Sequence, residues 1–131
     1  MPINAVFIRD VGPLRWAWRT VRRQFYKRIL CRDHRMQLPT GAWMRLPIVD
    51  HFASEAFITN ADVDWGSEQL LFFLLGGKVA FLDVGAHIGY YSLHMLLRLD
   101  AVYAFEPDPR VLALLEKTSA RSPTSKLFQA L

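Results

Sequence analysis

The sequence predicts an α/β fold in which strands alternate with helices to build a parallel sheet. Apolar runs at Val79–Val84 and Ala101–Phe105 have the length of strands that are buried on both faces. Helical patterns follow the two strands at Tyr90–Leu99 and Asp108–Ser119. Because a β-α-β unit almost always makes a right-handed crossover between parallel strands, both strands should end at the same edge of the sheet.

A basic amphipathic helix is expected near the N-terminus, from Leu14 to Leu30, with Pro13 in its first turn. Apolar and basic residues alternate there at helical spacing: Leu14, Trp18, Val21, Phe25 and Ile29 on one face, with Arg15, Arg19, Arg22, Arg23 and Arg28 over much of the rest. We expect Trp16, Trp18 and Phe25 to pack against the body of a longer, full-length protein rather than to contact a membrane interface.

The segment between this helix and the first predicted strand is less regular. Proline, glycine and asparagine break residues 36–61 into turns and short strands, such as Trp43–Val49, which suits a small antiparallel element. Ser67–Leu75 has the pattern of a helix, with Ser67 as a possible cap and Gly76 at its end. We therefore divide the chain into a leader, residues 1–49, and a sheet-containing domain, residues 50–131.

Charge is distributed unevenly along the chain. Residues 1–45 contain ten Lys or Arg and two Asp, which gives +8, whereas residues 46–131 contain six basic and ten acidic residues, which gives −4. A mildly acidic domain argues against nucleic-acid binding there. The sequence shows no apolar run long enough for a membrane span, no secretory signal and no Cys/His cluster for a metal, so we expect a cytoplasmic protein without a metal site.

The loop after the first strand carries the clearest functional motif, Asp83-Val84-Gly85-Ala86-His87-Ile88-Gly89. Glycine at 85 permits a sharp turn without a side chain against a ligand, and Gly89 lets the next helix begin close to the sheet. Asp83 is expected to accept hydrogen bonds from a cationic amine, directly or through water. Glu106, at the end of the second strand, is placed to accept both hydroxyls of a ribose.

Phosphate-binding motifs fit this loop poorly. A dinucleotide fingerprint that begins at Gly85 needs glycine where His87 and Tyr90 stand, and a P-loop needs Gly-Lys at Tyr90-Tyr91. An acidic residue at the start of the loop also repels a pyrophosphate but favours a cationic ligand. The charge pattern therefore favours S-adenosylmethionine, which carries a sulfonium and an amine but no phosphate.

The segments 81–93 and 102–109, read together, resemble the start of the FkbM family of S-adenosylmethionine-dependent methyltransferases. The resemblance implies a Rossmann-like class I methyltransferase fold and O-methylation of a small metabolite or sugar hydroxyl. Transferred by position, it implies that the cofactor is bound by the following residues: Asp83, Gly85, Ala86, His87, Gly89 and Glu106. It assigns no catalytic residue.

The sequence departs from the family pattern in two places. Only Asp100 separates the predicted helix that ends at Leu99 from the strand that begins at Ala101, so the crossover should be tight or its helix short. Residues 126–131 look like the start of a third strand, whereas a class I sheet has about seven strands at about 30 residues per β-α-β unit. We therefore expect a domain truncated after the second βα unit and inactive alone.

Two functional hypotheses follow. In the first, the chain is the N-terminal part of a methyltransferase whose acceptor is a small-molecule hydroxyl. In the second, the chain is a non-catalytic remnant that binds a partner or a membrane surface through its basic helix. We further expect only weak contact with anionic membranes, and self-association through the open edge of the sheet.

Overall fold

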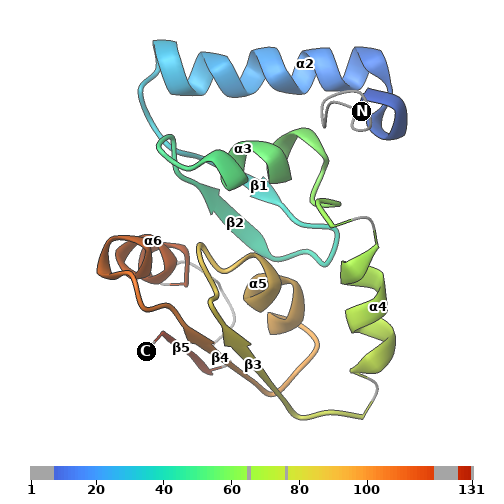
Figure 1. The fold of residues 1–131 in the computed structure, drawn as a ribbon, viewed down its shortest axis with the longest axis vertical. Coiled ribbons are helices and arrows are strands. Elements are labelled where there is room, and N and C mark those ends of the chain that lie inside the picture. Colours follow the sequence, from blue (N-terminus) through green and yellow to red (C-terminus); the bar gives the residue numbers. More distant parts are fainter. Residues whose placement is uncertain (1–7, 65, 76, 120–126, 131) are drawn as a thin grey trace. The chain divides into compact units, whose positions relative to one another are not determined.

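The fold is described from a computed structural model, which describes residues 8–64, 66–75, 77–119 and 127–130 (Figure 1). The chain is mixed α/β and forms two compact units. The leader unit comprises Met1–His34 and Leu46–Trp65, and the sheet unit comprises Arg35–Arg45 and Gly66–Leu131. The composition of the sequence places a boundary at residue 49. The contacts instead group residues 46–65 with the leader, because helix α3 (His51–Ile58) packs against helix α2 (Pro13–Gln24).

The expected basic helix is present in the leader unit. Helix α2 has Pro13 in its first turn and continues into a π-helical segment, η1 (Phe25–Ile29). Helix α3, by contrast, lies in a segment for which the sequence predicts only turns and short strands. Its start is fixed by Asp50, whose Oδ1 accepts a hydrogen bond of 2.6 Å from the amide of Ala53.

The apolar residues on one face of α2 are exposed in this chain. The exposed fractions of Leu14, Trp18, Val21, Phe25 and Ile29 are 86%, 66%, 63%, 48% and 69%. The side chain on the opposite face, Arg23, is fully buried. Its guanidinium donates to the carbonyl oxygens of Leu46 and Pro47, at 3.1 and 2.5 Å, and these polar partners explain why Arg23 lies inside.

The expected small antiparallel element is a hairpin of β1 (His34–Gln37) and β2 (Trp43–Leu46). The five residues between the strands are too few for a parallel crossover, so the strands run antiparallel. The turn is closed by a hydrogen bond of 2.8 Å from the amide of Leu38 to the carbonyl of Ala42. Strand β2 ends before Pro47 and is therefore shorter than the predicted Trp43–Val49.

In the sheet unit, α4 (Ser67–Leu74) precedes three parallel strands in the order β3-β4-β5. Two helices connect the strands, and the bounds along the chain are β3 (Ala80–Val84), α5 (Tyr90–Leu96), β4 (Ala101–Phe105), α6 (Pro109–Ser119) and β5 (Leu127–Ala130). The predicted order of elements is confirmed. Helix α5 ends three residues before the predicted Leu99, as expected for so short a connection to β4.

Both helices cover the same face of the sheet. Asp83 of β3 is hydrogen-bonded to Ser92 of α5, and its register partner on β4, Ala104, forms a buried cluster with Leu115 of α6. Neighbouring residues on a strand point to opposite faces. Leu82 and Val84 therefore lie on the other face, where their exposed fractions are 62% and 82%. The expectation that β3 is buried on both faces is thus wrong for the described residues, because both crossovers lie on one side.

Candidate functional site

The loop between β3 and α5 turns at three residues with positive φ. Gly85 has φ +80°, His87 +53° and Gly89 +83°. The first two amides of the loop, those of Gly85 and Ala86, both donate to the carbonyl oxygen of Phe105, at 2.8 and 3.0 Å. The amide of Gly89 donates to the carbonyl of Ala86 at 2.8 Å. The loop is therefore held against the carboxyl end of β4 by main-chain hydrogen bonds.

Glu106 connects this loop to the start of α6. One carboxylate oxygen, Oε2, accepts a hydrogen bond of 2.9 Å from the amide of His87, and the other, Oε1, accepts one of 3.0 Å from the amide of Asp108. A carboxylate oxygen can accept more than one hydrogen bond, so both retain capacity for a ligand. The two amides fix the carboxylate at the mouth of the loop.

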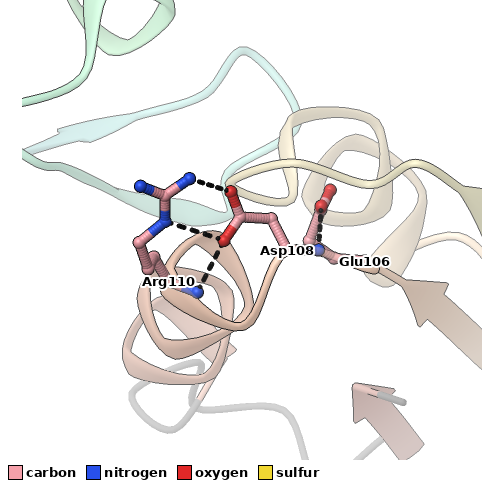
Figure 2. A network of polar contacts seen from close by, with 3 residues as sticks. All are labelled: Glu106, Asp108 and Arg110. Carbon is pink, nitrogen blue, oxygen red and sulfur yellow. Dashed lines mark hydrogen bonds and ion pairs between the residues drawn. The ribbon is translucent and has the colours of Figure 1, made fainter.

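Asp108 in turn caps helix α6. Its Oδ1 accepts from the amide of Arg110 at 2.9 Å, and its Oδ2 forms an ion pair of 2.8 Å with the guanidinium of the same residue (Figure 2). These hydrogen bonds from Arg110 lower the pKa of Asp108 to about 2. The segment after β4 is thus fixed by a chain of carboxylates and amides that runs from Glu106 through Asp108 to Arg110.

A pocket lies where β3 and β4 end. It has a volume of about 520 Å³ and is lined by Val84, Gly85, Phe105, Glu106 and Pro107. Its size falls within the range of about 300 to 1,000 Å³ that is typical of small-molecule sites. The walls are apolar except for Glu106, so a polar ligand would find one carboxylate and the main chain of Gly85.

Asp83 does not line this pocket. It lies on the face of β3 that the helices cover, and its Oδ2 accepts two hydrogen bonds from Ser92, one of 3.0 Å from the amide and one of 2.6 Å from the hydroxyl. Burial raises the pKa of Asp83, while the two hydrogen bonds from Ser92 lower it by a smaller amount. The structure therefore places Asp83 where it joins the end of β3 to α5.

The other predicted site residues shape the loop mainly through their main chain. Ala86 is buried in the cluster with Ala104 and Leu115, so its methyl group belongs to the core. The main-chain amide of His87 is the group that contacts Glu106. Gly89 occupies the N-cap position of α5 in a left-handed conformation. Of the six predicted residues, Gly85 and Glu106 line the pocket, and Ala86, His87 and Gly89 build the loop beside it.

Sequence reasoning missed two features of this region. One is the carbonyl of Phe105, which accepts from two loop amides but belongs to an ordinary apolar strand residue. The other is a buried polar cluster between α4 and α5, in which the Tyr90 hydroxyl donates to the carboxylate of Glu68 and the ring of His94 packs on Tyr90 at 4.7 Å. Burial lowers the pKa of His94, and Glu68 partly opposes this. In the sequence, this cluster was indicated only by the presence of a hydroxyl at Tyr90 and a carboxylate at Glu68.

Within the described ranges, no helix has the length and hydrophobicity to cross a bilayer, and no group of His, Cys, Asp or Glu side chains is arranged to hold a metal ion. The chain was compared with protein-family models, with curated proteins and with solved structures, and none of the three comparisons gave a match.

Proposed function

We propose that the sheet unit is the cofactor-binding part of an S-adenosylmethionine-dependent methyltransferase of the FkbM type, which methylates a hydroxyl of a small metabolite or sugar. One observation carries the proposal. The carboxylate of Glu106 and the glycine loop 85–89 meet at one pocket, at the carboxyl ends of two adjacent parallel strands. This is the position at which open parallel sheets bind nucleotides.

The topology supports a Rossmann-like fold for this unit. Strands β3, β4 and β5 are consecutive in sequence, parallel and adjacent in the sheet, as in one half of a doubly wound sheet. The resemblance of residues 81–93 and 102–109 to the FkbM family agrees with this arrangement.

Each element of the pocket has a role in the proposal. Glu106 accepts the ribose hydroxyls, which reach it from the side not occupied by the amides of His87 and Asp108. The main chain at Gly85 lies against the methionine portion, where a side chain would intrude. Asp83 is a positioning residue, because its contacts with Ser92 fix α5 and thereby the end of the loop.

The chemistry of the ligand suits this environment. A cofactor with a sulfonium and an amine is attracted to the carboxylate of Glu106, whereas a pyrophosphate is repelled by it. In the first turn of α5 the amide of Ser92 already donates to the carboxylate of Asp83, which disfavours a second anion there. The cofactor would supply an electrophilic methyl group to the acceptor oxygen, and the protein would orient the two reactants.

Ligand-observed NMR on the purified chain tests the proposal with S-adenosylmethionine as the probe. We expect Glu106→Gln to weaken binding about 10-fold or more, because a hydrogen bond to a charged group contributes about 1.5 to 3 kcal/mol. Asp100→Asn is the matched control, since Asp100 is an exposed carboxylate just before the opposite end of the same strand.

The control should bind like the wild type, and ATP or NAD⁺ should not displace the probe. Equal binding by wild type and Glu106→Gln would refute the ribose assignment. Displacement by ATP at a lower concentration than by unlabelled S-adenosylmethionine would refute the cofactor class.

A further inference from the structure

A ridge of apolar side chains runs along the outer face of the leader unit. It consists of Leu14, Trp18, Val21, Phe25 and Ile29, and the exposed fractions of its members range from 48% to 86%. From Leu14 to Ile29 the helical rise of 1.5 Å per residue gives a length of about 22 Å. A continuous exposed stripe of this kind, with a tryptophan and a phenylalanine, marks an interaction surface.

The helix cannot turn this ridge inward without losing its polar contacts. Arg23 donates to the carbonyls of Leu46 and Pro47 and to the hydroxyl of Ser54. One turn earlier, Arg19 donates to the carbonyl of Phe57 at 2.6 Å and to the side chain of Asn60 at 2.5 Å. The two inward arginines therefore fix the rotation of α2 about its axis, and the ridge remains outside.

The charges beside the ridge indicate what covers it. Pro13–Ile29 contains six basic residues and no acidic residue. Two of the six, Arg19 and Arg23, donate hydrogen bonds to other residues of the leader unit. Of the others, Arg15, Arg22 and Arg28 are exposed, and the first two lie about a quarter turn from the centre of the ridge at 100° per residue. An apolar stripe flanked by exposed arginines is complementary to a surface with apolar chains below a layer of negative charge.

We propose that α2 and η1 form an interfacial anchor that binds an anionic lipid surface, with the ridge among the acyl chains and the flanking arginines at the level of the lipid phosphates. This surface is separate from the pocket at Glu106 and does not depend on the function proposed for it. Both parts of the anchor are required, because a short apolar ridge alone or a few arginines alone bind a membrane weakly.

Vesicle co-sedimentation of the full chain tests the proposal. The vesicles are phosphatidylcholine, either pure or with about 30% phosphatidylglycerol, at an ionic strength of about 0.15 M. We expect the chain to bind the anionic vesicles at least about 10-fold more strongly than the neutral ones. The double variant Trp18→Gln/Phe25→Gln should bind the anionic vesicles at least about 10-fold more weakly than the wild type. The matched control is Phe73→Gln, which removes an aromatic ring of 83% exposure from α4.

The control should bind like the wild type, and the paired variant should keep the far-UV circular dichroism of the folded chain. Quenching of tryptophan fluorescence by brominated acyl chains supplies a second measurement, because it should fall sharply in Trp18→Phe. Equal binding to neutral vesicles, an equal loss in Phe73→Gln, or no binding of the folded chain would overturn the proposal. So would a concentration-dependent dimer that Trp18→Gln abolishes in the absence of vesicle binding, since a second copy would then cover the ridge.

Discussion

Replacing Arg23 by methionine tests whether the side of α2 that carries Arg19 and Arg23 is its inner face. Methionine matches the aliphatic stem of arginine as far as Nε but lacks the guanidinium, so Arg23→Met preserves the packing of the stem and removes the donors. The carbonyls of Leu46 and Pro47 and the hydroxyl of Ser54 then lose partners at 3.1, 2.5 and 3.1 Å.

The expected magnitude follows from these contacts. Hydrogen bonds from a charged donor contribute about 1.5 to 3 kcal/mol each, but the variant no longer has to bury a guanidinium. Each buried acceptor that is left without a donor costs about 1 to 3 kcal/mol, and two carbonyls lose their donor here, which is a large part of a total stability of about 5 to 15 kcal/mol. We therefore expect a loss of about 3 kcal/mol or more in the free energy of unfolding.

Urea denaturation followed by tryptophan fluorescence measures this loss. Arg15→Met is the control, because Arg15 is exposed on the same helix, and we expect it to change stability by no more than about 0.5 kcal/mol. A cost for Arg23→Met as small as that for Arg15→Met, or a gain in stability, would refute the reasoning and indicate that the apolar face packs inward.

Three further predictions concern pH, the end of β3 and the open face of the sheet. Burial, together with the charges of Arg23 and Arg22, lowers the pKa of His34 from 6.5 to about 4. Between these two pH values the unfolded chain binds more protons than the folded chain, so the free energy of unfolding should fall by up to about 3 kcal/mol as the pH falls from 6.5 to about 4. His34→Asn should flatten that dependence in urea denaturation at a series of pH values, and an unchanged slope would contradict the assignment. Ser92→Ala should lower stability by about 1.5 to 3 kcal/mol in thermal unfolding, because the buried Asp83 carboxylate loses its 2.6 Å hydroxyl donor; a cost near zero would show that the contact is dispensable. Light scattering should show that the wild-type chain self-associates and that the double variant Leu82→Gln/Val84→Gln does so less, because both side chains lie on the uncovered face of the sheet. A wild-type chain that stays monomeric at all concentrations would contradict this.

Local patterns predicted the elements of the sheet unit well. Strand Ala101–Phe105 has the bounds that the sequence indicates, and β3 begins one residue after the predicted Val79. These elements are specified by short apolar runs between turn residues, which are visible within a window of about ten residues. The glycine loop was predictable for the same reason, because Gly85 and Gly89 directly follow an apolar run and glycine readily adopts a positive φ. The place of Glu106 was predictable because it directly follows the second apolar run, which forms β4.

Contacts between distant residues could not be predicted in this way. The pattern of α2 shows two faces but not which one lies inside, because the partners of Arg23 are carbonyls 23 and 24 positions away. The same limit applies to Asp83. Its place at the end of a strand suggested a ligand contact, whereas its oxygen is held by Ser92, one turn into the following helix. Only the fold brings these groups together.

The central claim is that the pocket between the ends of β3 and β4 binds S-adenosylmethionine. The most direct measurement is a ¹H–¹⁵N correlation spectrum of the chain during titration with S-adenosylhomocysteine, which resembles the cofactor but transfers no methyl group. The account predicts concentration-dependent shifts of the amides of Gly85, His87 and Glu106, which line or border the pocket, and none at Asp100 near the opposite end of β4. Saturable shifts confined to residues outside this pocket, or no shift at any ligand concentration in a folded chain, would contradict it.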